Sequence, residues 1–283
     1  MKLAEIYVRD PFILPFEGSY YLYAKIIRED SKFVVYKSQD LENWSGPEVV
    51  FQPDPDFWGK RDFWAPEVHC YNGKFYMFAS FKAEGKCRGT HVLISNHPQG
   101  PFYPVSSAPA TPADWECLDG TLYVDKNGNP YMVFCHEWLQ IGNGTMCYAR
   151  LGRDLAAQIE KPTLMFSAHD YPFVVGCIEG RESYVTDGPF LHRCQNDDLL
   201  MIWSSFGKNG YFIHVQKSDN GEITGQWLPQ NMLFSENGGH GMLFRTFDGK
   251  LKLVFHSPND IAGAERAKIV DILECDGSLR INE

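Results

Sequence analysis

Three aspartates stand in similar local settings, each at the start of a short extended segment. Asp10 precedes Pro11, while Asp119 and Asp187 each precede a glycine. If the fold brings these carboxyl groups together, their like charges raise one another's pKa, so that one group stays protonated while another stays ionised. A paired acid and base of this kind is what the hydrolysis of a glycosidic bond requires.

Other polar and aromatic residues occupy comparable places. His240 lies between two glycines at a fourth segment start, and Ala65 opens a fifth, with Glu67 two residues later. Aromatic rings offer flat faces to sugars, so we expect sugar contacts from the aromatic residues near the mouth, which are Trp58, Trp64, Trp138 and Phe206. The other candidates for the wall of the site are His136, Glu137, Ser204, Ser205 and His256.

The elements that would hold these residues form an internal repeat. A turn residue followed by an aromatic-rich strand occurs five times, at residues 18–23, 73–78, 128–134, 198–203 and 249–255. Each copy follows a short extended segment and precedes a third strand, often with a fourth. Four antiparallel strands that recur about every 50 to 60 residues are typical of propeller blades. We therefore predict an all-β, five-bladed β-propeller that forms one domain over residues 1–283.

This fold predicts where the candidate residues meet. The first strand of every blade lines the central channel, so the leading residues of the blades converge near the axis. By this alignment the leading residues are Asp10, Ala65, Asp119, Asp187 and His240. A β-sandwich is the alternative fold, but its strands would not repeat one local motif five times.

Each candidate also has an ordinary structural interpretation. Asp-Pro and Asp-Gly pairs are common in turns, and a lone histidine between glycines could cap a strand. Arg266, in the last blade, could simply form a surface ion pair. What favours function is that Asp10, Asp119 and Asp187 recur at the same place in three blades.

The composition and charge of the chain argue against two classes of binding partner. Apolar residues make up 44% of the chain, and the formal net charge is −10 with no Lys/Arg-rich run. We therefore expect neither nucleic acid nor a membrane surface as a partner. Residues 1–5 lack the apolar core of a signal peptide, which predicts a cytoplasmic protein unless a leader was removed. The oligomeric state is left open.

The eight cysteines are scattered, with no C-x-x-C pair and no histidine at zinc-finger spacing. Several lie in apolar runs, as Cys135 does. We expect free buried thiols and no zinc.

Taken together, the motifs resemble glycoside hydrolase family 43 over nearly the whole chain. The residues that carry the resemblance are Asp10-Pro11, Trp64-Ala65-Pro66-Glu67, Asp119 before Asp125-Lys126-Asn127-Gly128, Asp187-Gly188-Pro189 and Gly239-His240-Gly241. That family contains β-xylosidases, α-L-arabinofuranosidases, arabinanases and galactan-degrading enzymes. The resemblance implies hydrolysis of arabinose, xylose or galactose linkages in plant-type oligo- or polysaccharides.

The resemblance also implies roles for individual residues. The mechanism would be inverting, with Asp10 as the general base and Asp119 as the group that tunes and orients the acid. His240 matches a histidine that often lies beside a calcium ion in the channel; no other cofactor is expected. By the same resemblance, Arg266 would contact substrate.

The general acid is where the sequence departs from the family. The family places Glu in a Glu-Gly-Pro turn, and here that position is Asp187. The shorter side chain moves the carboxyl group by roughly 1.5 Å, so the acid is either Asp187 or a substitute. Glu137 is the best substitute, and Glu182 and Glu67 are weaker ones.

Two other functions remain open at this point. Asp187 in place of Glu also fits a carbohydrate-binding propeller without catalysis. Arg9-Asp10-Pro11 and Trp115-Glu116-Cys117 resemble motifs of the retaining fructosidases, but the Asn-Asp-Pro of that family is absent and the blade order differs. We rank the family 43 interpretation first. The segment 168–182 is expected to close one end of the cleft, which predicts a pocket and an exo-acting enzyme.

Overall fold

The computed structural model describes residues 1–26, 31–275 and 277–282, and these residues form five sheets of four antiparallel strands. Blade 1 contains β1 (Phe12–Phe16), β2 (Ser19–Lys25), β3 (Phe33–Ser38) and β4 (Trp44–Phe51). Blade 2 contains β5 (Arg61–Tyr71), β6 (Lys74–Ala83), β7 (Lys86–Ser95) and β8 (Tyr103–Pro104). Blade 3 contains β9 (Cys117–Val124), β10 (Pro130–His136), β11 (Thr145–Arg150) and β12 (Thr163–Ser167).

The last two blades follow the same order. Blade 4 contains β13 (Asp187–Arg193), β14 (Leu199–Gly207), β15 (Gly210–Ser218) and β16 (Trp227–Phe234). Blade 5 contains β17 (Gly239–Arg245), β18 (Leu251–Ser257), β19 (Arg266–Cys275) and β20 (Ser278–Ile281). The short helices in the described residues are η1 (Leu3–Glu5), α1 (Trp138–Ile141) and η2 (Ala168–Asp170).

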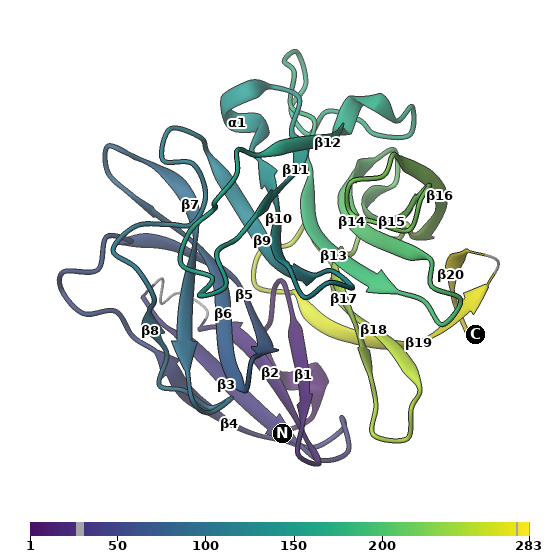
Figure 1. Cartoon of the computed structure of the whole chain (residues 1–283). Helices are drawn as coiled ribbons and strands as arrows, with labels where there is room; N and C mark the ends of the chain where they lie inside the picture. The colour runs from purple at the N-terminus through teal and green to yellow at the C-terminus, as the bar shows by residue number, and fades with distance from the viewer. Residues whose placement is uncertain (27–30, 276, 283) are drawn as a thin grey trace.

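The first strands of the blades surround one axis (Figure 1). Each of β1, β5, β9 and β13 contacts the first strand of the next blade, and β17 contacts β1 again. The ring is therefore closed, which confirms the predicted five-bladed propeller.

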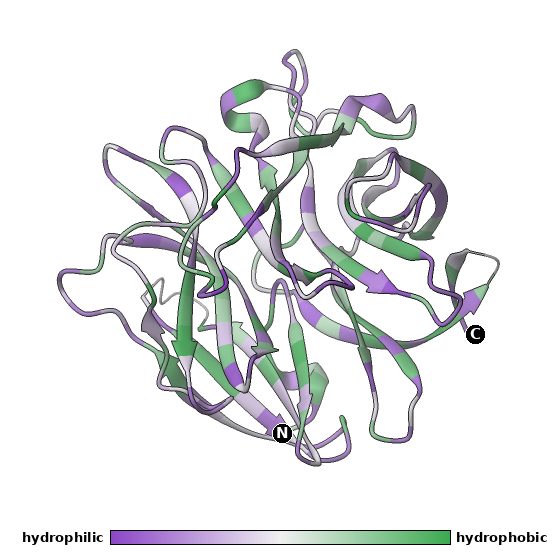
Figure 2. Ribbon diagram, viewed as in Figure 1, coloured by the Kyte–Doolittle hydropathy of each residue, from purple (hydrophilic) through white to green (hydrophobic). Residues whose placement is uncertain are grey.

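Aromatic-rich second strands form the core because each blade packs between two others. In β6, seven consecutive residues from Phe75 to Phe81 are buried. A run that is apolar on both faces suits a strand covered on both sides. Hydrophobic residues accordingly concentrate on the strands in Figure 2, and the apolar clusters lie between successive blades.

The N-terminal segment joins the first blade to the last. The amino group of Met1 donates to the carbonyl of Trp44 at 2.9 Å, and Trp44 returns a backbone hydrogen bond of 2.9 Å. Further along, Tyr7 forms a β-bridge with Arg266 in β19. Residues 1–8 thus span blades 1 and 5 immediately before Asp10, so the closure of the ring also places the first aspartate.

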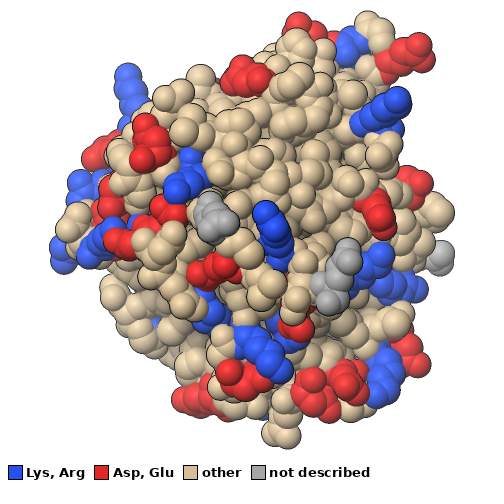
Figure 3. Space-filling model, turned by 90° about the vertical axis from the view of Figure 1, so that its right-hand side faces the viewer, with Lys and Arg blue, Asp and Glu red and all other residues tan. Residues whose placement is uncertain are grey.

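Two further sequence expectations concern the cysteines and the surface. All eight cysteines are free thiols, as expected, and four of them are buried. Acidic and basic side chains are interspersed over the face shown in Figure 3. Among the described residues, no helix combines the length and hydrophobicity that a membrane-spanning helix needs.

Candidate active site

The first strand of four blades starts with a β-bulge. In blade 2, Trp64 pairs with Ser80 and Glu67 pairs with Phe78, so three residue steps oppose two. The same shift occurs between Leu118 and Thr121, Asp187 and Phe190, and Gly239 and Met242. A bulge re-aims side chains and is common beside active sites.

A residue with positive φ marks each bulge. These residues are Ala65 (φ 45°), Asp119 (φ 54°), Gly188 (φ 50°) and His240 (φ 50°), and Asp10 (φ 54°) takes the same conformation before β1. The true equivalent of Asp10 in blade 4 is therefore Gly188, and the sequence alignment that placed Asp187 there was wrong by one residue. Asp187 instead matches the residues just before the others: Arg9, Trp64, Leu118 and Gly239.

A cavity of about 330 Å³ lies where these strands start. Its lining residues are Tyr7, Arg9, Asp10, Lys25, Trp64, Leu118, Asp119, Asp187, His240 and Glu265. Five of them were candidates from the sequence, namely Asp10, Trp64, Asp119, Asp187 and His240. The bulge explains why both a positive-φ residue and the residue before it reach the cavity.

The other five lining residues were missed. Arg9 and Leu118 each come directly before the leading residue of a blade, as Trp64 and Asp187 do in the structure. This shared position was a signal in the sequence that could have identified them. Arg9 donates to Oε1 of Glu265 at 3.2 Å and to Oδ1 of Asn259 at 2.8 Å. Because those contacts join the start of the chain to blade 5, local sequence patterns could not predict them.

Two histidines contact Asp10, His240 at its carboxylate and His256 as the acceptor of its backbone N–H. Nδ1 of His240 lies 3.1 Å from Oδ1 of Asp10 and 3.5 Å from Oδ2 of Asp119. Nδ1 of His256 lies 3.4 Å from the same oxygen of Asp10 and accepts its backbone N–H at 3.3 Å. The backbone N–H of Gly188 donates to Oδ2 of Asp119 at 3.1 Å. The three aspartates are thus parts of one connected site.

Second strands support the bulges of the following blades. Oγ of Ser80 accepts the N–H of Asp119 at 3.0 Å, and Oγ of Ser204 accepts the N–H of His240 at 2.8 Å. Since a buried N–H needs a partner, these hydroxyl groups allow the left-handed backbone to sit at the axis.

The surroundings of Asp10 and His240 shift their pKa values in opposite directions. Burial alone would raise the pKa of Asp10, but the neighbouring His240, Arg9 and His256 hold it well below its usual range. Burial would lower the pKa of His240, but Asp10 and Asp119 raise it to about 10. Asp10 is therefore ionised and His240 is protonated at neutral pH, so Asp10 is in the form that can accept a proton.

The pKa values of the other two carboxyl groups of the site are raised. Burial and the charge of Asp119 raise the pKa of Asp187 well above its usual range. Burial and the charge of Asp10 also raise the pKa of Asp119, to about 6, although His240 acts against them. One carboxyl group that keeps its proton beside one that has lost it forms an acid and base pair.

Glu137, the substitute acid, lies outside the lining of this cavity. Its Oε2 accepts a hydrogen bond from Nε of Arg88 at 3.2 Å, and it is 5% exposed. Nη1 of Arg88 also donates to Asp62 at 2.9 Å, and its guanidinium lies 3.8 Å from the centre of the Trp64 ring. Burial still raises the pKa of Glu137, but its carboxylate holds an arginine that packs on the ring of Trp64.

Glu116, from the fructosidase-like motif, is also paired. It binds Nζ of Lys82 at 2.6 Å and the backbone N–H of Arg88 at 2.7 Å, and it does not line the cavity.

The remaining sequence candidates lie outside the cavity lining. Glu67 is buried and lies 3.1 Å from Nε2 of His69. His136 stacks on Trp115 with 4.2 Å between ring centres, and Trp138 lies 5.1 Å from the guanidinium of Arg181.

Three more candidates make contacts within the protein. Phe206 packs against Tyr211 with ring centres 5.0 Å apart. Nε1 of Trp58 donates to His91 at 2.9 Å. The guanidinium of Arg266 donates to the carbonyls of Ala4, Gly263 and Glu265.

The segment 168–182 contributes none of the residues that line the cavity. Glu182 is exposed. The backbone of Val175 donates to Phe206 at 2.8 Å, which places this segment beside the end of β14.

The calcium ion implied by the resemblance would lie beside His240. Calcium takes six to eight oxygen ligands. Nδ1 of His240 already lies between Asp10 and Asp119, and in the described part of the channel no three His, Cys, Asp or Glu side chains bring their donor atoms within 4.8 Å of one another. These side chains do not form a calcium cage, and calcium stays a prediction of the resemblance.

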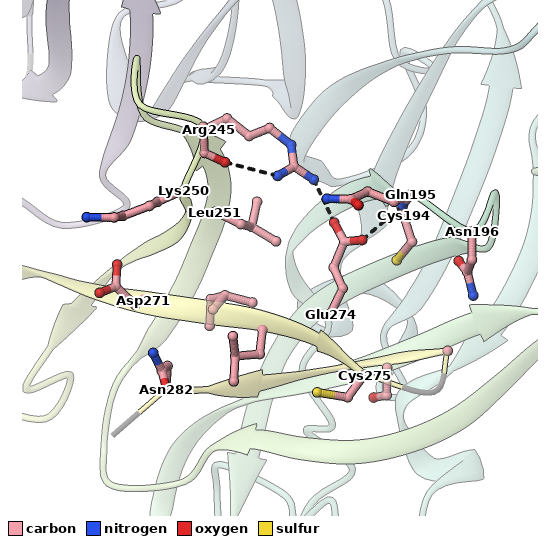
Figure 4. Close-up of a pocket in the computed structure, with 15 residues that line it drawn as sticks. Cys194, Gln195, Asn196, Arg245, Lys250, Leu251, Asp271, Glu274, Cys275 and Asn282 are labelled. Carbon is pink, nitrogen blue, oxygen red and sulfur yellow. Dashed lines mark hydrogen bonds and ion pairs between the residues drawn. The ribbon is translucent and has the colours of Figure 1, made fainter.

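A second, larger cavity of about 630 Å³ lies between blades 4 and 5 (Figure 4). Close to it, donor atoms of His192, Cys194 and Glu274 lie within 4.8 Å of one another. However, Oε1 of Glu274 accepts a hydrogen bond from Arg245 at 2.7 Å and lies 2.8 Å from His192. A guanidinium so close repels a metal cation, so Glu274 serves here as the partner of Arg245 and His192 between two blades.

Comparisons with known proteins identify the family of this chain. The family model described as glycosyl hydrolases family 43 matches residues 4–276. The structure of an endo-arabinase from Bacteroides thetaiotaomicron VPI-5482 is similar at 39% identity and a TM-score of 0.93, with 98% of each chain covered. An extracellular exo-α-(1→5)-L-arabinofuranosidase of Cellvibrio japonicus is 24% identical, over 89% of this chain and 79% of that protein.

Proposed function

The chain belongs to family 43 of the glycosyl hydrolases and hydrolyses O-glycosyl bonds, and from this premise we propose that its substrate is an arabinan, cleaved with inversion at the anomeric carbon. The names of the two relatives above support arabinose-containing substrates. The cavity of about 330 Å³ lies at the small end of ligand pockets, which suits one or two sugar units.

One observation carries the mechanism. Asp10 and Asp187 line the same cavity, and their surroundings lower the pKa of the first and raise that of the second. Asp10, held ionised by His240 and Arg9, takes a proton from a water molecule. That water attacks the anomeric carbon as Asp187 gives its proton to the departing oxygen. Asp119, which accepts the N–H of Gly188, keeps the carboxyl group of Asp187 protonated through its own negative charge.

Proton NMR of an arabinofuranoside reaction tests the proposal. The first-formed arabinose is expected to have the inverted anomeric configuration, and Asp10→Asn, which keeps the shape but loses the charge, should lose almost all turnover while still binding sugar. A retained anomer overturns the single-displacement mechanism. Absence of turnover on arabinose, xylose and galactose glycosides would instead favour a sugar-binding propeller.

Product size tests the exo prediction. With linear arabinan, exo action releases only arabinose during the first few per cent of the reaction. Early oligosaccharides of several lengths would show internal cleavage, in line with the name of the Bacteroides relative.

A further inference from the structure

Tyr211, in β15, is a buried residue whose hydroxyl group reaches the proposed acid. It donates a hydrogen bond to Oδ2 of Asp187 at 2.9 Å and is 1% exposed. Because Tyr211 does not line the cavity, its hydroxyl group can influence a substrate through Asp187, to which it donates.

The tyrosine ring is fixed by its surroundings. It stacks on His256 with 5.7 Å between ring centres and contacts Phe206 at 5.0 Å. On another side lies Gly239, where a Cβ would come within 2.4 Å of Cε1 of the ring. A glycine is therefore required there for the ring to fit, and the hydroxyl group has one defined direction.

The direction of the hydrogen bond distinguishes the two oxygens of Asp187. Burial raises the pKa of Tyr211 well above its usual range, so the hydroxyl keeps its proton and donates it. A protonated carboxyl group has one O–H and a second oxygen that only accepts. Oδ2 is the acceptor here, which leaves Oδ1 to carry the acidic proton.

We propose that Tyr211 is a positioning residue that keeps the proton of Asp187 on Oδ1 and stabilises the carboxylate that forms when this proton leaves. The inference rests on the proposed function, in which Asp187 is the acid. The proton of Oδ1 goes to the glycosidic oxygen as its bond to the anomeric carbon breaks. Water supplies the hydroxyl group for that carbon, and its proton goes to Asp10. The hydrogen bond from Tyr211 strengthens as negative charge develops on Asp187.

Tyr211→Phe tests this role because the ring stays and only the hydroxyl group is lost. We expect kcat/KM to fall roughly 10- to 100-fold on an alkyl or sugar leaving group, but less than about 3-fold on a glycoside of an acidic phenol, which departs without a proton. The ratio of the two values does not depend on the fraction of folded enzyme.

The pH profile gives a second readout. Asp119, His240, Asp10, Arg9 and Glu137 are the charged groups around Asp187, and all of them remain in the variant. Loss of a hydrogen bond to the ionised form raises the pKa of Asp187, so the alkaline limb of kcat/KM moves to higher pH. A purely structural role would lower the profile without moving this limb.

Tyr23→Phe is the matched control. Tyr23 is also fully buried, and its hydroxyl group donates to the carbonyl of Pro98 at 2.7 Å. This variant should keep the wild-type leaving-group ratio and alkaline limb.

Replacement of Tyr211 by 3-fluorotyrosine covers the case in which the phenylalanine variant does not fold. A fluorophenol donates more strongly, so the alkaline limb should move to lower pH, opposite to the phenylalanine variant. An unchanged ratio and limb in a folded Tyr211 variant overturns the inference. Failure of the proposed function is recognised separately, because the wild-type protein would then hydrolyse neither substrate.

Discussion

At the residue scale, the site gives two side chains of the same type opposite protonation states. Asp10 and Asp187 are both aspartates in one cavity, yet the pKa of the first is held low and that of the second is raised. The sequence could predict that carboxyl groups would meet, because their blades repeat. It could not predict which would ionise, because His240 and His256 reach Asp10 from blade 5 and Tyr211 reaches Asp187 from β15.

The identity of the acid can be tested by leaving-group dependence. Asp187→Ala should lower kcat/KM by more than about 100-fold on sugar leaving groups and spare acidic phenols, because only the former need the proton. Glu137→Ala should lower activity on both substrates alike, since it releases Arg88 from the ring of Trp64. Steady-state kinetics on the two substrates decides between them. A selective loss in Glu137→Ala alone would make Glu137 the acid.

The same two aspartates should affect stability with opposite sign. The raised pKa of Asp187 means that its contribution to stability is present below its ordinary pKa and is lost as pH rises through its folded value. Asp187→Asn should therefore raise Tm increasingly with pH. Asp10, with a lowered pKa, contributes stability above its ordinary pKa, so Asp10→Asn should lower Tm at pH 7.

Thermal unfolding from pH 5 to 9 measures both effects. Shifts of a few degrees are expected, since about 1 kcal/mol corresponds to roughly 2 to 4 °C in chains of this size. Shifts of the same sign in the two variants would contradict the assignment of acid and base.

At the element scale, the bulge at the start of the first strand is what makes the site. The aromatic repeats predicted the strands themselves, since alternating and apolar runs show strand periodicity. The bulges were not predicted, because a residue type such as that of Ala65 rarely adopts positive φ. Asp187 was misplaced by one position because the Asp-Gly pairs of blades 3 and 4 were aligned with each other, whereas the positive φ shows that Asp119 matches Gly188.

Gly188 tests the bulge in blade 4. It has φ +50°, and a Cβ there would lie 2.8 Å from Cγ of His240. Gly73→Ala is the control, because Gly73 has φ +74° and no heavy atom within 4 Å of the added Cβ. Both variants should lose roughly 1 to 2 kcal/mol from backbone strain, but only Gly188→Ala should also displace His240 and lower kcat/KM, by about 100-fold. Equal activity in the two variants would show that His240 tolerates the contact.

At the scale of the whole molecule, the number of blades could be predicted and the closure of the ring could not. Five copies of one strand motif require five sheets around an axis. The N-terminal segment bridges blades 1 and 5 through backbone contacts, such as those of Met1 with Trp44 and Tyr7 with Arg266. Backbone pairing of this kind leaves little trace in residue type, so no sequence pattern indicated that Arg266 pairs with Tyr7.

Arg266 and Arg9 lie on either side of this closure and should respond differently to substitution. Arg266 donates to carbonyls of Ala4, Gly263 and Glu265, so Arg266→Ala should lower Tm by several degrees, at about 1 kcal/mol for each lost hydrogen bond. Its kcat/KM, measured well below Tm, should change less than about 3-fold. Arg9→Met should instead lower kcat/KM by at least about 10-fold, because Arg9 lines the cavity and lies 3.9 Å from Oδ1 of Asp10. If Arg266→Ala raises KM sharply without a loss of Tm, then Arg266 contacts substrate as the family resemblance implied, and the closure contacts are not its main role.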